Sequence, residues 1–121
     1  MEGTRAMNKI RVLIVEPNKE PKQIKIEHTL KSLQSIVGGL VEFVGIEHNL
    51  DLICNEEGKI NGLELNRCVG NDIIAGTFII VGQHYGETIS LSRKQIKKYK
   101  NIFRLDNNKV QHFLIKYIYK I

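Results

Sequence analysis

The sequence predicts an α+β fold: a mixed, mostly antiparallel sheet of about five to six strands, one helix packed across it, and two C-terminal helices. Two observations support this prediction. Short β-branched and apolar runs separated by turn residues fill most of the chain, and one amphipathic segment interrupts them early. Further helical patterns appear only in the last thirty residues. Strands and helices that are grouped rather than strictly alternating are typical of α+β domains.

The first strands are predicted to form a hairpin. Residues 9–15 (KIRVLIV) are apolar and β-branched and are followed by Pro17, which indicates a central strand. Residues 23–27 (QIKIE) alternate apolar and polar side chains, as a half-buried partner strand does. The segment between them has the composition of a turn.

A helix and two more strands follow. The helix is predicted from Thr29 and ends at Gly38, because glycine accepts the left-handed conformation found at helix ends. Residues 40–46 and 50–54 are then predicted to be strands, with a polar turn after the second. The apolar stripe of the helix contains Leu30, Leu33, Ile36 and Val37.

The middle of the chain is less regular. Residues 60–67 suit a short strand or an irregular crossing segment, so that 52–67 would be two arms of a sheet with a polar turn between them. Residues 73–82 contain a buried strand, placed at 77–81, and Gly76 before it indicates a bulge or a close backbone approach. The predicted core of the sheet and first helix contains Leu13, Ile14, Leu33, Phe43, Leu52, Phe78 and Ile80.

Two helical patterns end the chain. Ser92 and Gln95 have the spacing of a capping box, which starts a helix with an apolar stripe through Ile96, Tyr99, Ile102 and Phe103. We expect one domain over 1–103 and a helical extension over 104–121.

The extension has an apolar stripe at helical spacing, although its aromatic and β-branched residues also suit a strand. As a helix, its apolar face must dock on its own sheet or on another subunit. We favour self-association, with a dimer as the default. The predicted oligomer contacts are Phe113, Leu114, Tyr117 and Ile118.

Composition excludes several classes of protein. The 121 residues contain no apolar run of the roughly 18 residues that a membrane span needs, and the first residues lack a signal-peptide core. We therefore expect a cytoplasmic, globular protein without a membrane partner. The net charge of +5 is uneven: residues 1–91 hold nine Lys/Arg and twelve Asp/Glu, and residues 92–121 hold nine Lys/Arg and one Asp.

No residue pattern indicates an enzyme or a metal site. Cys54 and Cys68 lack the paired ligands of a zinc site, so core packing is favoured over a metal or redox role. Glu56 and Glu57 are adjacent and would point apart on a strand. Cys54 with His84 would be a nucleophile and base only if the fold brought them together. We expect no catalytic residues, no metal and no cofactor.

A ligand site is nevertheless conceivable around Asn66 and Arg67. Arginine presents a planar fork suited to phosphate or carboxylate. As an isolated cation in an acidic region, Arg67 is either an ion-pair partner of Glu64 or Asp72, which we favour, or a ligand for a small anion. The residues of this hypothetical ligand site are Asn55, Asn66, Arg67, His84 and Tyr85.

The predicted helix after Ser92 offers a second surface. Lysine and arginine on one helix face can neutralise phosphates, although solvated surface lysines have the same appearance. The opposed charges could equally steer two subunits together. The residues of this hypothetical nucleic-acid or partner surface are Arg93, Lys94, Lys97 and Lys98.

Three segments resemble a known family. LICNEEGKINGLELNR (52–67), DIIAGTFIIVG (72–82) and SLSRKQIKKY (90–99) are similar to the signature segments of the domain of unknown function 3846, and VLIVEPNKEP and LQSIVGG also fit. The resemblance covers about 9–100; VGN (69–71) is shorter than the acidic insert typical of the family. The resemblance implies a small protein of Gram-positive bacteria, their phages and conjugative elements. It also implies an accessory role, such as one against host defence, and assigns no catalytic residue.

The leading hypothesis is therefore a non-enzymatic binding protein of a mobile element, an inhibitor or sequestering factor that acts on host defence machinery. Its partner would be a host protein or a small anionic ligand. The alternative is a nucleic-acid-binding module that uses the basic C-terminal helices. A small enzyme is the third hypothesis.

Overall fold

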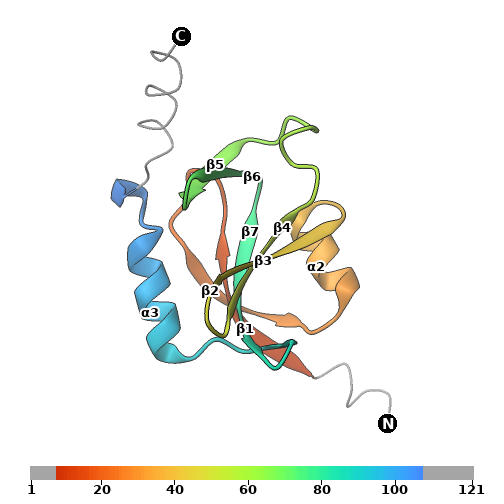
Figure 1. Cartoon of the computed structure of the whole chain (residues 1–121), viewed down its shortest axis with the longest axis vertical. Coiled ribbons are helices and arrows are strands. Elements are labelled where there is room, and N and C mark those ends of the chain that lie inside the picture. The colour runs from red at the N-terminus through yellow and green to blue at the C-terminus, as the bar shows by residue number, and fades with distance from the viewer. Residues whose placement is uncertain (1–7, 108–121) are drawn as a thin grey trace.

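The computed structural model of the protein describes residues 8–107, which form eight strands, two α-helices and one short 3-10 helix (Figure 1). The helices are α2 (Leu30–Val37), α3 (Arg93–Ile102) and η1 (Leu105–Asn107). The strands are β1 (Lys9–Val15), β2 (Lys22–Glu27), β3 (Val41–Glu47), β4 (Leu50–Asn55), β5 (Leu65–Val69), β6 (Asp72–Ala75), β7 (Phe78–His84) and β8 (Glu87–Ile89).

Six of the strands form one sheet in the order β2-β1-β7-β4-β3, and β8 pairs with the end of β7. Each of these pairings is antiparallel. β5 and β6 form a separate antiparallel pair. The prediction of a mostly antiparallel sheet is thus confirmed. The prediction that 52–67 contains two arms of one sheet is wrong, because β4 belongs to the large sheet and β5 to the small one.

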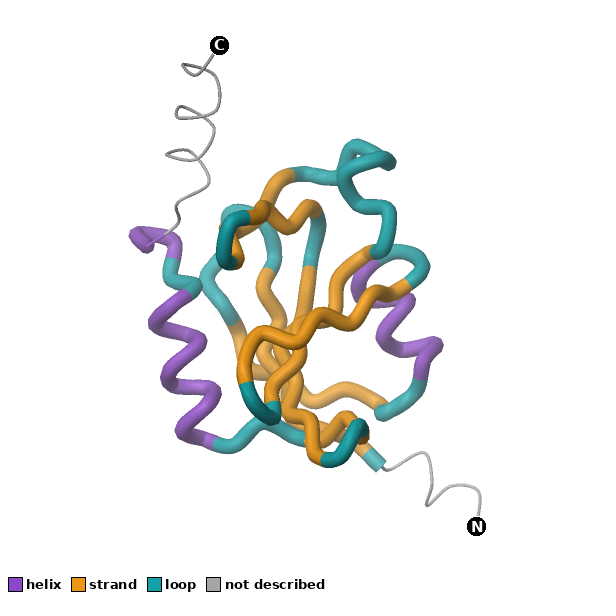
Figure 2. The backbone as a smooth tube through the Cα atoms, viewed as in Figure 1, coloured by secondary structure: helices purple, strands orange, loops and turns teal. Residues whose placement is uncertain are grey.

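Helices cover both faces of the large sheet, as Figures 1 and 2 show. Alternate residues along each central strand point to opposite faces, so the core has two parts. Leu13, Leu52 and Ile80 contact the α3 side, while Val12, Ile53 and Ile79 contact the α2 side. The predicted arrangement, with one helix across the sheet and two C-terminal helices, is therefore corrected: α3 is itself a sheet-covering helix. A second C-terminal α-helix would lie outside the described residues.

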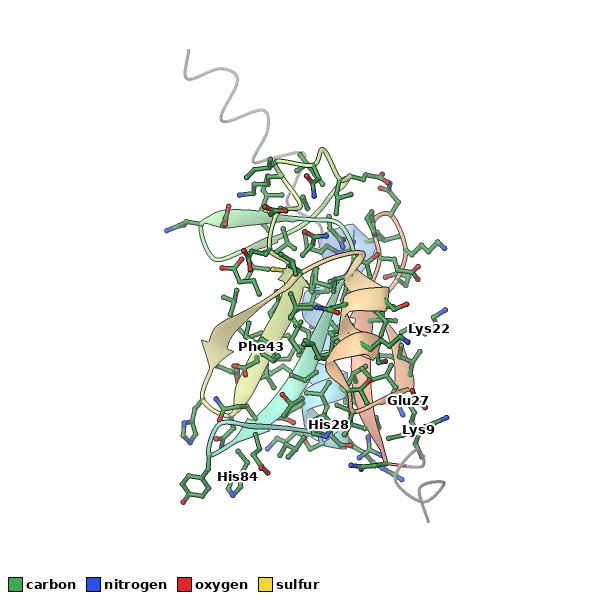
Figure 3. The ribbon with its side chains drawn as sticks, turned by 90° about the vertical axis from the view of Figure 1, so that its right-hand side faces the viewer. Lys9, Lys22, Glu27, His28, Phe43 and His84 are labelled. Carbon is green, nitrogen blue, oxygen red and sulfur yellow. The ribbon has the colours of Figure 1, made fainter. Side chains whose placement is uncertain are left out.

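The predicted core is confirmed with two exceptions. Ile14 is only half-buried, and Phe43 is 48% exposed. Phe43 lies on β3, an edge strand, to one side of α2 (Figure 3). The helix has only eight residues and buries Leu33 and Val37, so it leaves the face of this edge strand in solvent.

The helix ends agree with the sequence. The Thr29 hydroxyl accepts a hydrogen bond from the Ser32 amide, and Gly38 adopts a left-handed φ of 81°. Ser92 and Gln95 form the complete capping box at the start of α3. Ile102, however, is exposed at the end of that helix.

Gly76 divides the apolar run 73–82 between the two sheets. Its φ is 86°, and a Cβ at this position would lie 2.7 Å from Cδ1 of Leu63. The predicted close backbone approach is confirmed, and only glycine satisfies both the left-handed φ and the close contact. The run therefore forms β6 and β7 rather than one strand. No helix in the described part of the chain is long and apolar enough to cross a membrane.

Candidate functional site

Arg67 is a buried cross-link between three segments of the chain. Its side chain is 1% exposed. Nε donates to the Phe103 carbonyl at 2.9 Å, at the end of α3. The two terminal nitrogens donate to the carbonyls of Lys19 at 2.6 Å and Glu16 at 3.5 Å, in the turn between β1 and β2. Burial lowers the pKa of the guanidinium from its ordinary value, and the nearby Glu20 carboxylate raises it.

Asn66 completes this cross-link from the neighbouring position in β5. Its Nδ2 donates to the carbonyls of Val15 and Gly76, at 2.9 and 2.8 Å, and its Oδ1 accepts from Arg67 at 2.8 Å. The two side chains therefore join β5 to the end of β1, the start of β7 and the end of α3. Because both are almost completely buried and their polar groups bind the protein itself, this geometry does not support the predicted ligand role.

The ion pairs expected for Arg67 are also corrected. Asp72 pairs with Lys59, and Glu64 accepts a hydrogen bond from Asn18. Arg67 donates instead to backbone carbonyls. The end of a helix beside a turn is a suitable environment for an arginine fork, because it offers several carbonyl acceptors.

Asn55 has a structural role of the same kind. Its Nδ2 donates to the Val37 carbonyl at the end of α2, at 3.1 Å, and its Oδ1 accepts from the Glu57 amide at 2.8 Å. The second bond is an Asx turn that begins the loop after β4. At Gly58, a Cβ would lie 2.6 Å from the Ala75 carbonyl. These residues of the signature segment 52–67 thus mainly make hydrogen bonds and close contacts within the protein.

The surroundings of Cys54 disfavour a nucleophilic role. The thiol is buried, and burial, with a smaller effect of the Glu42 carboxylate, raises its pKa to about 11. It lies beside a hollow of about 290 Å³ whose lining includes Glu42, Asp72 and Lys59; the two carboxylates disfavour a thiolate and the Lys59 ammonium opposes them with a smaller effect. His84 lies at the other end of the sheet (Figure 3). Among the described residues, no three His, Cys, Asp or Glu side chains are placed to hold a metal ion.

The outer face of α3 is the basic surface. Ile96, Tyr99 and Phe103 face the core, so the remaining sides of the helix carry its cations into solvent. Lys98 pairs with Glu47 at 2.9 Å, and Tyr99 donates a 2.6 Å hydrogen bond to the same carboxylate. These two bonds lower the pKa of Glu47. Lys98 therefore anchors α3 to β3.

A groove runs between α3 and the turn before β2. It has a volume of about 600 Å³ and is lined by Glu20, Pro21, Lys97, Lys98, Lys100, Asn101 and Arg104. Arg104 pairs with Asp106, and Glu20 accepts a hydrogen bond from the Leu105 amide. Within the described residues, Arg93, Lys94, Lys97 and Lys100 form no ion pair. We call these four side chains the basic face.

His84 and Tyr85 lie away from Asn66 and Arg67. Asn66 binds the carbonyl that precedes β7, whereas His84 ends this seven-residue strand, about 20 Å further along at the usual rise per residue. The five residues of the hypothetical ligand site are therefore not one site. The oligomer contacts predicted at Phe113, Leu114, Tyr117 and Ile118 lie outside the described residues, as does most of the 104–121 extension.

Sequence reasoning missed the carbonyl cross-link of Arg67 and the role of Lys98. An isolated arginine after an apolar run was a signal for the first. For the second, the sequence held no signal, because Glu47 and Lys98 are 51 residues apart.

Comparisons with known proteins agree with the segments singled out above. No curated protein and no solved structure matches the chain. A family model described as domain of unknown function (DUF3846) matches residues 10–104, which include every described strand except the first residue of β1. The chain therefore belongs to the DUF3846 family.

Proposed function

We propose that the protein acts by binding rather than by catalysis, and that the basic face of α3 is its contact surface for the phosphates of a nucleic acid. The observation that carries this proposal is the set of four exposed cations, Arg93, Lys94, Lys97 and Lys100, with no ion-pair partner among the described residues. A cationic surface left without counter-charges within the protein favours an anionic partner.

The like charges along α3 destabilise the helix. Arg93 and Lys97 are four residues apart, as are Lys94 and Lys98, and like charges at this spacing repel one another. A solvated surface helix usually mixes both signs, yet the segment 92–105 holds six cations and no acid. Binding to phosphate would remove this repulsion.

The length of the basic face sets the expected number of phosphate contacts and the salt dependence of binding. From Arg93 to Lys100 the helix rises about 10 Å, which is the axial length of about three nucleotides on one DNA strand. Three phosphate contacts predict that the logarithm of the association constant falls with the logarithm of the salt concentration with a slope of about −3.

The proposal is tested by measuring affinity for a labelled oligonucleotide, single- or double-stranded, between 50 and 200 mM salt. We expect wild-type affinity to fall about 40-fold over this range for double-stranded DNA and about 20-fold for a single strand. Replacing Lys94, Lys97 and Lys100 with Glu should weaken binding at the lower salt concentration by at least about 100-fold. Lys98 is left unchanged because it anchors α3 to β3.

A matched variant controls for net charge. Replacing Lys22, Lys25 and Lys31 with Glu changes the net charge by the same amount, but on β2 and α2. This variant should retain most of the affinity. Equal losses in the two variants, or a wild type that ignores DNA and RNA at low salt, would contradict a site on α3.

A second candidate is the inhibitor of a host protein. It is supported by the β3 edge of the sheet, where Phe43 is 48% and Leu40 56% exposed. An open strand with exposed apolar side chains is a common place for a partner chain to pair. The opposite edge, β2, exposes Lys22, Gln23 and Lys25 instead.

A further inference from the structure

The turn between β7 and β8 holds a residue that its backbone disfavours. The two-residue loop Tyr85–Gly86 has φ values of 49° and 83°, which is left-handed at both positions. Such turns favour asparagine followed by glycine. The other two non-glycine residues with positive φ in the described chain are Asn18 and Asn49. Tyr85 is the exception.

Packing does not explain this tyrosine. Its side chain is 92% exposed, and its ring meets only the neighbouring His84 ring, edge to face with centroids 4.5 Å apart, among the contacts of the described residues. A ring that is 92% exposed at a strained position contributes little to the packing of the fold beyond its contact with His84. Such strain is typical of residues that serve an external contact.

A hollow of about 380 Å³ lies beside the turn. It is lined by three aromatic residues, two acidic residues and three others: His48, His84, Tyr85, Glu47, Asp51, Gly45, Asn49 and Gln83. Glu47 is already bound by Lys98 and Tyr99. Asp51 is half-buried and has no cation partner among the described residues.

This combination selects the charge and shape of a ligand. Carboxylates repel phosphate, so the hollow differs from the basic face of α3. Aromatic faces and an unpaired carboxylate together attract a cation, and a planar one can stack on the rings while it hydrogen-bonds to the carboxylate. Lysine offers a point charge without a plane.

We propose that the hollow between the β3–β4 and β7–β8 turns binds an arginine side chain presented by a partner protein. Asp51 is the counter-ion, and the Tyr85 and His84 rings form the stacking surface. This proposal is independent of the nucleic-acid surface, because it uses a different part of the molecule and the opposite charge.

The test is an NMR titration of the full-length, ¹⁵N-labelled protein with the probe acetyl-Gly-Arg-Gly-amide. Shift changes should be confined to the amides around Asp51 and to residues 83–87. A citrulline peptide, which has the same shape without the charge, should bind at least tenfold more weakly. Equal shifts with citrulline, or shifts located elsewhere, would overturn the proposal. So would an oligonucleotide that perturbs these same amides, since it would make Tyr85 a base-stacking residue.

Two variants separate binding from folding. Asp51→Asn should weaken binding of the arginine peptide at least tenfold. Glu57→Gln, which removes an exposed carboxylate elsewhere, should leave this affinity unchanged. Tyr85→Asn suits the left-handed turn, so it should raise the urea midpoint and yet weaken binding. If Tyr85→Asn instead lowers the urea midpoint, the ring supports the fold and the proposed role is wrong.

Discussion

Arg67 and the cations of α3 are chemically alike but have opposite environments. Arg67 is 1% exposed and donates to three backbone carbonyls from two other segments. Arg93, Lys94, Lys97 and Lys100 lie in solvent without ion pairs in the described structure. The same charge therefore supports the fold in one place and remains available for a partner in the other.

The difference shows why residue type alone does not identify a site. A buried guanidinium loses its hydration, so it is tolerated only where several acceptors replace water. Because those acceptors are internal and the side chain is buried, the guanidinium is directed at the protein itself rather than at a ligand. An exposed lysine keeps its water and can exchange it for phosphate.

The largest expected effect is on Arg67. Arg67→Met keeps much of the volume but leaves the carbonyls of Phe103 and Lys19 without their donor, so the free energy of unfolding should fall by about 2–4 kcal/mol. Urea denaturation of the two proteins measures this loss of unfolding free energy. Lys97→Met is the control and should change stability by no more than about 0.5 kcal/mol. Similar losses of unfolding free energy in the two variants would contradict the distinction between the buried Arg67 and the exposed cations of α3.

A smaller effect is expected from alkaline pH. Burial raises the pKa of Cys54 to about 11, and burial with a hydrogen bond to Glu47 raises that of Tyr99. At pH 7 and below, well under its ordinary pKa of 9.0, the Cys54 thiol is protonated in both the folded and the unfolded chain. As pH rises from there towards 11, the unfolded chain releases this proton first, so stability falls, by up to about 2 kcal/mol for Cys54.

The measurement compares urea denaturation at pH 8 and pH 10.5. Cys54→Ala should lose less stability than wild type between the two pH values, whatever its cost at pH 8. An unchanged loss would mean that the Cys54 thiol is not shielded from solvent.

The smallest effect concerns Lys98, which is a cation of α3 that does have a partner. Both side chains of the Lys98–Glu47 pair are about half exposed, so a double-mutant cycle should give a coupling of about 0.5 kcal/mol. The coupling should decrease in high salt. A value near zero would place Lys98 with the basic face instead.

Much of the fold followed from local patterns. The boundaries of β1, the Thr29 and Gly38 ends of α2 and the Ser92 capping box depend on residues close in sequence. Which sheet a strand joins depends on distant segments, so the separation of β5 and β6 from the large sheet was not predictable. The exposure of Phe43 was missed because its strand is an edge, a property of strand order alone.

The candidate sites show the same limit. Three cations of the basic face, Arg93, Lys94 and Lys97, were in the predicted surface because helical periodicity groups them. The fourth predicted cation was Lys98, which pairs with Glu47, rather than Lys100. The hollow beside Tyr85 was not predicted, because Asp51 and His84 come from different hairpins. His84 and Tyr85 were grouped in one hypothetical site with Arg67, although they lie about 20 Å away along β7.

The central position of β7 has a consequence for synthesis of the chain. β7 pairs with β1 on one side and β4 on the other, yet it comes after both in sequence. Until residue 84 has left the ribosome, the β1–β2 and β3–β4 hairpins have no strand to join them. Long-range pairing of this kind slows folding and leaves nascent strand edges open to aggregation. A ribosome-bound chain should therefore remain protease-sensitive until β7 emerges, and then become protected in a single step.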